Sequence, residues 1–210
     1  MLIEENAVVL FQGDSITDCG RSRENLDDLG RGYAFMTAAL FQSLHPERNV
    51  RFINRGIGGN TVEDLKARWH DDCVALKPTW LSILIGINDA ARAFTQSKPM
   101  SAEVFESTYH ELLLGVRAKC GARLILMEPF VLPIPEDRIH WREDLDAKVH
   151  AVRRLAREFE AILIPLDGLF AQAAARKDMV FWAPDGVHPT PAGHALIARH
   201  WLKSVKALLN

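Results

Sequence analysis

Short apolar segments alternate with longer stretches of helical periodicity along the chain, and this alternation constrains the fold more than any other feature. The apolar segments cover residues 7–11, 51–54, 81–85, 123–127 and 161–166. They are apolar on both faces, as parallel strands are when helices cover both sides of a sheet. The intervening stretches, residues 33–44, 61–76, 101–119, 141–159 and 190–209, are predicted helices. The order predicts an α/β fold, a three-layer α/β/α sandwich around a five-stranded parallel sheet.

Length, charge and cysteine content narrow the class of protein. The 210 residues predict a single domain over residues 1–210, and a net charge of −2 argues against a nucleic-acid or membrane-surface partner. The N-terminus has no basic segment before its first apolar run, and no apolar run reaches the length of a membrane span. We therefore expect a cytoplasmic protein. Cys19, Cys73 and Cys120 form no CxxC pair, so we expect reduced thiols and neither a zinc knuckle nor a redox pair, and the histidines show no metal-ligand spacing, so no metal site is expected.

The unusual polar clusters of the chain follow the predicted strands directly. Segments 12–18, 55–61 and 86–90 come after the first three strands and are rich in Gly, Asn, Ser and Asp. Ligands bind open parallel sheets beyond the carboxyl ends of the strands. We therefore expect the chemistry at that edge.

The first cluster places Ser15 in the turn Gly13-Asp14-Ser15-Ile16-Thr17. A serine in a tight strand-to-helix turn can present its hydroxyl at the sheet edge, although a simple turn or helix cap has the same composition. The pattern is not the G-x-S-x-G elbow of α/β-hydrolases, and the lysine of a Walker loop is missing.

Two further clusters offer hydrogen-bond donors. Gly58-Gly59 lets the backbone approach a ligand closely, and Asn88 follows the third strand, where its amide can point into the crevice. The alternatives are a flexible turn before a capped helix and an Asx turn.

The last cluster is Asp185-Gly186-Val187-His188-Pro189, just before the final helix. An aspartate three residues before a histidine can fold back onto its Nδ1–H and leave Nε2 free to face a nucleophile. An ordinary polar loop has the same residue types, so this pair indicates a catalytic role only in combination with the other clusters.

Together these clusters resemble the four signature blocks of GDSL/SGNH hydrolases, in the family's order from Gly13 to Pro189. The resemblance implies a flavodoxin-like SGNH-hydrolase fold and a catalytic triad of Ser15, Asp185 and His188. It also implies an oxyanion hole made of the Ser15 N–H, Gly59 and Asn88, with no cofactor. Gly59 is favoured over Gly58 because the family's glycine precedes a small polar pair, here Asn60-Thr61.

The segments GDSITDCGR, NRGIGGNTVEDLKARW and WAPDGVHPT resemble the bacterial acetylxylan and carbohydrate esterase branch. This implies an esterase that removes acetyl groups from xylo-oligosaccharides or other acetylated sugars. Trp182, Arg55 and Asp14 are candidate substrate-binding residues, although core packing for Trp182 and loop bracing for Arg55 and Asp14 are equally open. We also consider self-association possible.

Two other functions compete with this interpretation. A lysophospholipase or thioesterase would use the same triad with an apolar channel, to which residues 130–133 could contribute. A non-catalytic flavodoxin-like module would bind phosphate or FMN at the GDSIT turn. That module would have no use for Asp185 and His188.

Overall fold

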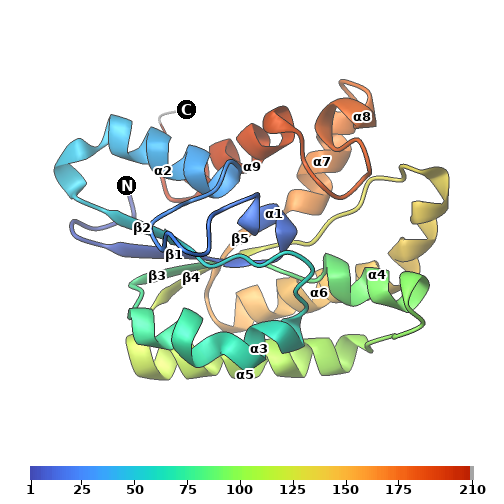
Figure 1. Ribbon diagram of the computed structural model, residues 1–210, viewed down its shortest axis with the longest axis horizontal. Coiled ribbons are helices and arrows are strands. Elements are labelled where there is room, and N and C mark those ends of the chain that lie inside the picture. Colours follow the sequence, from blue (N-terminus) through green and yellow to red (C-terminus); the bar gives the residue numbers. More distant parts are fainter. Residues whose placement is uncertain (209–210) are drawn as a thin grey trace.

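The computed structural model describes residues 1–208 and shows a parallel sheet between two layers of helices (Figure 1). The sheet has the order β2-β1-β3-β4-β5, and all its strand pairs are parallel. The strands are β1 Val8–Gly13, β2 Arg51–Asn54, β3 Trp80–Leu84, β4 Arg123–Met127 and β5 Ile162–Ile164. The predicted sandwich with five parallel strands is therefore confirmed.

The helices divide between the two faces of the sheet (Figure 1). One face carries α2 Tyr33–Leu44, α7 Leu166–Ala174, α8 Met179–Trp182 and α9 Pro191–Ser204. The other carries α3 Val62–Asp72, α4 Ile87–Thr95, α5 Ala102–Cys120 and α6 Arg142–Glu158. The four-residue α1, Ser15–Asp18, follows β1, and the short 3₁₀ helices are η1 Pro46–Arg48, η2 Val74–Leu76 and η3 Glu136–Trp141. None of the helices in residues 1–208 is long and apolar enough to cross a membrane.

Successive side chains of the central strands enter opposite cores, as the two-residue period of a strand requires. In β1, Val9 and Phe11 belong to the core under α2 and α9, whereas Leu10 belongs to the core under α3, α5 and α6. All three are completely buried. Burial on both faces explains why these segments read as continuous apolar runs.

Several boundaries differ from the sequence prediction. The predicted helix 61–76 ends at Asp72 and is followed by η2. The last helix ends at Ser204, before its predicted end at Leu209, a residue that lies outside the described ones. Helices α4, α7 and α8 were not predicted. Helix α4 starts directly after Gly86, so its first turn reads as a loop in the sequence. Helix α7 starts directly after Pro165, so its first residue reads as the end of the preceding strand.

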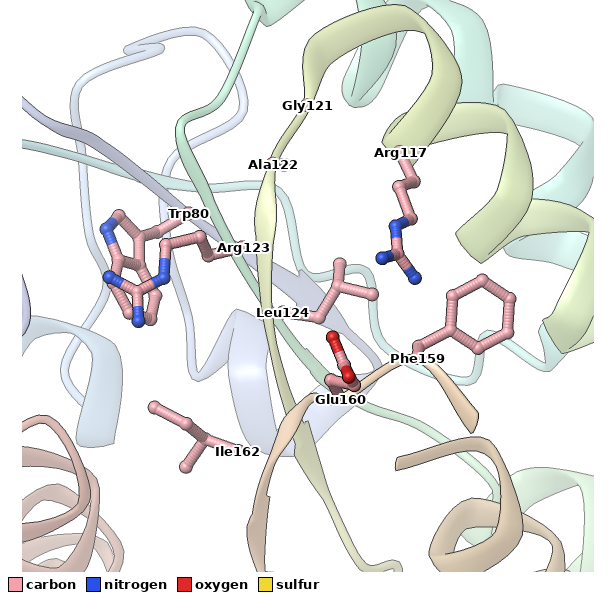
Figure 2. A pocket seen from close by; sticks show the side chains of 9 residues that line it. All are labelled: Trp80, Arg117, Gly121, Ala122, Arg123, Leu124, Phe159, Glu160 and Ile162. Carbon is pink, nitrogen blue, oxygen red and sulfur yellow. The ribbon is translucent and has the colours of Figure 1, made fainter. Parts of the chain in front are cut away.

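One hollow lies at the amino ends of the strands. It measures about 520 Å³ and is lined by residues at the starts of β3, β4 and β5, with the Arg123 guanidinium 4.2 Å above the Trp80 ring (Figure 2). Parallel sheets bind ligands at the opposite, carboxyl edge, and the site described below lies at that edge.

The last helix is anchored to the sheet by Trp201. This side chain is completely buried, its Nε1–H donates to Ser82 Oγ at 3.0 Å, and its ring lies 5.6 Å from that of Phe11. Helix α9 follows the Asp185–His188 loop, so the packing of Trp201 also limits where that loop can lie.

We expect Trp201→Ala to lower the free energy of unfolding by about 3–5 kcal/mol, because it removes a large buried ring and leaves a cavity. Urea denaturation measures this. The control is Leu44→Ala on α2, where the side chain is 48% exposed and the expected change is within about 0.5 kcal/mol. Equal effects of the two substitutions would contradict the anchoring role.

Candidate active site

The predicted serine, histidine and aspartate meet in one continuous hydrogen-bonded chain. Ser15 Oγ lies 2.9 Å from His188 Nε2, and His188 Nδ1 lies 2.7 Å from Asp185 Oδ2. Ser15 is the first residue of α1, whereas Asp185 and His188 belong to the loop between α8 and α9. The fold thus brings together side chains that are 173 residues apart in sequence.

The turn that presents Ser15 requires a glycine before it. A Cβ at Gly13 would lie 2.3 Å from the carbonyl oxygen of Leu84 on the neighbouring strand. Asp14 then caps α1 by accepting a hydrogen bond from the Ile16 N–H at 3.0 Å. The chain therefore turns sharply at the sheet edge, and the hydroxyl of Ser15 remains outside the core.

Asp185 fixes both the backbone and the ring of His188. Its Oδ1 accepts from the N–H groups of His188 at 2.7 Å and Val187 at 3.0 Å, while Oδ2 faces the ring. Partial burial opposes ionisation of Asp185, but the hydrogen bonds from the His188 ring and these two N–H groups outweigh it and lower the pKa of Asp185. An ionised Asp185 is a pure acceptor, so it favours the tautomer with hydrogen on Nδ1 and leaves Nε2 free toward Ser15.

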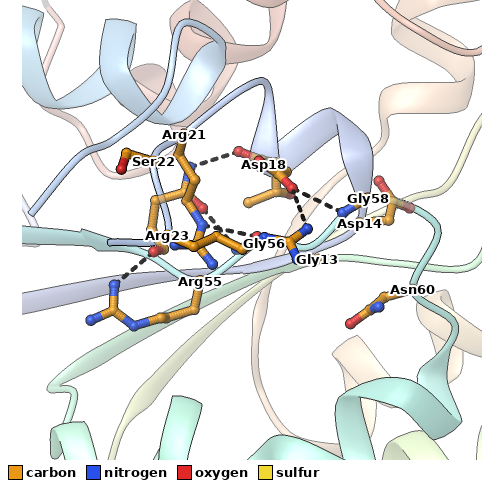
Figure 3. Close-up of polar contacts among 12 residues, drawn as sticks. Gly13, Asp14, Asp18, Arg21, Ser22, Arg23, Arg55, Gly56, Gly58 and Asn60 are labelled. Atoms are coloured by element: carbon orange, nitrogen blue, oxygen red, sulfur yellow. Dashed lines mark hydrogen bonds and ion pairs between the residues drawn. The ribbon is translucent and has the colours of Figure 1, made fainter. Parts of the chain in front are cut away.

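The loop after β2 lies beside Ser15. A Cβ at Gly58 would be 3.7 Å from the Cβ of Ser15. The Gly58 N–H donates to Asp18 Oδ2 at 3.0 Å, as Figure 3 shows, whereas within residues 1–208 the Gly59 N–H has no hydrogen-bond acceptor. This favours Gly59 over Gly58 as a donor to a bound ligand.

Asn88 borders the same loop. Its Nδ2 donates one hydrogen to the carbonyl of Asn60 at 3.0 Å, which leaves the second hydrogen of the amide for another acceptor. Asn88 therefore lies against the loop that borders Ser15, and its role as an oxyanion donor stays a prediction.

Two arginines hold this loop, of which the sequence did not single out Arg68. Arg68 on α3 donates from Nε to Asn60 Oδ1 at 2.8 Å and from its guanidinium to the carbonyl of Arg55 at 2.8 Å. Arg92 on α4 donates to the carbonyl of Gly59 at 2.9 Å. In sequence Arg68 reads as half of an ordinary i,i+4 ion pair with Asp72, so no local signal distinguishes it.

A buried histidine links the two ends of the site. His194 Nδ1 accepts from the Tyr33 N–H at 3.1 Å, so the ring hydrogen sits on Nε2, which lies 3.4 Å from Cys19 Sγ. Burial, with a smaller effect of His188, lowers the pKa of His194 to about 4. Because Cys19 ends the turn of Ser15 and His194 belongs to α9, this neutral ring ties the nucleophile's turn to the helix that follows His188.

The structure places the three candidate substrate-binding residues as follows. Asp14 is only 1% exposed, and its carboxyl caps α1 from within the core. Arg55 is buried and donates to the carbonyls of Leu26 and Asn54, so it braces the loop. The Trp182 indole N–H donates to backbone carbonyls at the end of α7, and the ring packs against the core. The Asp14 carboxyl and the Arg55 guanidinium thus serve the fold, whereas the partly exposed ring of Trp182 stays a candidate contact for substrate.

Two buried carboxyls lie directly behind the site. Asp14 precedes Ser15 and Asp89 follows Asn88, and each uses only one carboxyl oxygen within the described part of the chain. Burial is the main cause that raises the pKa of Asp14 to about 7 and that of Asp89 to about 6. The mutual repulsion of the two carboxylates adds to the shift at Asp14.

The raised pKa of Asp14 predicts a pH-dependent stability. In the unfolded chain Asp14 ionises near its ordinary pKa, whereas in the folded protein it ionises at about 7. Its contribution to stability therefore falls as pH rises from about 4 to about 7. We expect the stability of Asp14→Asn relative to the wild type to increase over this range by more than about 1 kcal/mol. Chemical denaturation at pH 4.5 and 7.5 measures it, and a constant difference would contradict the shift.

Comparison with known proteins agrees with this geometry. Residues 11–196 match the model of the GDSL-like lipase/acylhydrolase family. An acetylxylan esterase from Geobacillus stearothermophilus is 36% identical over 98% of this chain and 96% of its own length. The crystal structure of a Geobacillus stearothermophilus acetylxylan esterase has a TM-score of 0.89 at 35% identity, over 98% of this chain and 96% of that one.

A crystal structure described as that of a GDSL-like lipase from Parabacteroides merdae has a TM-score of 0.92 at 34% identity, over 98% of both chains. Family model, relatives and fold lead to the same conclusion. The chain belongs to the GDSL-like lipase/acylhydrolase family and is a carboxylic ester hydrolase.

Proposed function

We propose that the protein is a serine esterase that works through an acyl-enzyme at Ser15. The observation that carries this proposal is the hydrogen-bonded chain from Ser15 Oγ to His188 Nε2 at 2.9 Å and from His188 Nδ1 to Asp185 Oδ2 at 2.7 Å. These distances lie within the reach that proton transfer between a nucleophile and its base requires.

In the first step His188 Nε2 takes the proton of Ser15 as Oγ attacks the ester carbonyl. The imidazolium that forms is stabilised by the ionised Asp185, and it then protonates the leaving alcohol. Water repeats the same sequence on the acyl-enzyme and releases the acid. Every proton is carried by His188, so the reaction as proposed needs no cofactor.

The negative charge on the attacked carbonyl oxygen would be met by the N–H groups of Ser15 and Gly59 and by the side-chain amide of Asn88. Donors held in place before the reaction stabilise this charge without reorganising. The hydrogen bonds that the Gly58 N–H donates to Asp18, Arg92 to the Gly59 carbonyl and Asn88 to the Asn60 carbonyl hold these groups in the free enzyme.

We propose short acyl esters of sugars, acetylated xylo-oligosaccharides in particular, as substrates. The Geobacillus stearothermophilus relative is an acetylxylan esterase, and its alignment covers nearly the full length of this chain. Structures of that enzyme include three described as catalytic mutants, with alanine replacing a serine, an aspartate and a histidine. The same three residue types form the hydrogen-bonded chain here.

The competing functions find less support. Phe130, Val131 and Leu132, considered as part of an acyl channel, are at least 95% buried, and the Phe130 ring stacks on Phe170 at 3.9 Å. They pack the core and leave a lysophospholipase or thioesterase without that channel. A phosphate at the GDSIT turn would lie beside the Asp14 carboxyl, and Ser15 is already paired with His188.

A cytoplasmic location is part of the proposal. Cys19, Cys73 and Cys120 are free thiols, and Cys73 is fully buried. Unpaired cysteines are typical of reducing compartments.

We expect Ser15→Ala to abolish acetate release from an acetylated oligosaccharide panel and labelling by a serine-directed phosphonate, because no other hydroxyl is bonded to His188 Nε2 in residues 1–208. Acetate measurement and intact-mass spectrometry check the two results. Thermal unfolding of the variant serves as the control for folding. Wild-type acetate release by the variant would refute the proposed nucleophile.

We expect Asn88→Ala to lower kcat by about 10²–10³-fold, because one oxyanion donor is lost. Steady-state kinetics with an acetyl ester measure it. A loss confined to KM, with kcat unchanged, would mean that Asn88 only positions the Asn60 loop.

A further inference from the structure

An open groove of about 600 Å³ lies between the end of α4 and the η3 segment. In Figure 1 the yellow segment that contains η3 comes close to α4. The residues that define its character are two aromatic side chains and four charged or titratable ones: Phe94, Trp141, Asp137, Arg138, His140 and Glu143. The mechanism proposed above uses none of them.

Arg138 joins this groove to the catalytic residues. Its guanidinium donates to the backbone carbonyl of Asp185 and lies 3.9 Å from the Asp185 carboxylate. The same guanidinium lies 4.7 Å from the centre of the Trp141 ring. One wall of the groove is therefore in contact with the triad.

The opposite wall is joined to the predicted oxyanion donor. Asn88 and Phe94 both belong to α4, and six residues of helix span ~9 Å. The groove therefore lies beside both the helix that carries Asn88 and the loop that carries Asp185. This position fits the alcohol part of the substrate.

The lining suits a neutral molecule with one apolar face and several hydroxyls. Phe94 is 42% exposed and offers an aromatic face to solvent. His140 and Glu143 are exposed and 3.3 Å apart at the rim, where they can bond to hydroxyl groups. Such a combination of aromatic surface and a few oriented polar groups is typical of small-molecule sites.

The same lining disfavours a phosphorylated headgroup and an alkyl chain as occupants of the groove. A phosphorylated headgroup would meet the carboxylates of Asp137 and Glu143. An alkyl chain would remove water from four charged or titratable side chains without replacing their hydrogen bonds, which is costly. A sugar ring can stack on Phe94 and replace those hydrogen bonds with its hydroxyls.

We propose that this groove is the binding subsite for a sugar ring of the alcohol that is released when Ser15 is acylated. The proposal rests on the esterase function proposed above and adds to it where the sugar lies and which side chain selects it. Phe94 supplies the apolar face, and Arg138 keeps the wall next to Asp185 in place.

The first test compares two acetyl esters, acetylated xylotriose and ethyl acetate, which share the acyl group but differ in the ring. We expect Phe94→Ala to lower kcat/KM for acetylated xylotriose about tenfold, through KM, and to leave ethyl acetate unchanged. The matched control is Phe35→Ala on α2, where the ring is 50% exposed, and it should change neither. Equal values for Phe94→Ala and wild type on both esters, or an equal loss on both, would overturn the subsite.

The second test separates the groove from catalysis. Xylotriose itself is titrated calorimetrically into Ser15→Ala, alone and combined with Phe94→Ala or Phe35→Ala. We expect weaker binding, about tenfold, only with Phe94→Ala. If the wild type hydrolyses neither ester, the esterase proposal is refuted. The titration still tests the sugar subsite in that case, because equal affinities in all three proteins would show that no sugar binds at Phe94.

Discussion

The parallel direction of the strands is the constraint on which the site depends. Strand β1 lies between β2 and β3, and all three run the same way. Their carboxyl ends therefore deliver Ser15, Gly59 and Asn88 to one edge, with the nucleophile in the middle. The ladder continues past the strands, because the Ile57 N–H donates to the Gly13 carbonyl at 3.1 Å. The donor loop is thus held in register with the serine turn by backbone hydrogen bonds.

The base reaches this edge by a different route, since His188 follows no strand. Helix α9, which follows the His188 loop, fixes one end of that loop. Trp201 of α9 is buried against Ser82, and His194 of α9 is bonded to the Tyr33 N–H and to Cys19. The loop is also positioned by Asp185, which holds the backbone and the ring of His188 together. A loop without sheet neighbours can therefore hold an imidazole at bonding distance from a serine at the other end of the chain.

The parts of this arrangement that depend on short sequence patterns could be predicted. Strands that are buried on both faces read as apolar runs. An unusual composition at strand or helix ends marks the polar clusters, which are Asp14-Ser15, Gly58-Gly59, Asn88 and the Asp185–His188 pair. The strand order could not be read in this way, because adjacency in a sheet is not encoded within a strand. Nor could the roles of Arg68 and Arg138, whose targets are backbone carbonyls from distant loops.

Burial and hydrogen bonding sort the carboxyls around Ser15 into two electrostatic classes. Asp185 keeps contact with solvent and accepts three hydrogen bonds, so its pKa is lowered and it is ionised where an imidazolium would form. Asp14 and Asp89 are desolvated and accept one hydrogen bond each, and their pKa values rise to about 7 and about 6. They therefore carry less negative charge below neutral pH, next to the residues that would face the oxyanion. Stronger ionisation at these two positions would oppose the charge that develops on the substrate oxygen, so the burial that costs stability above neutral pH also suits the proposed chemistry.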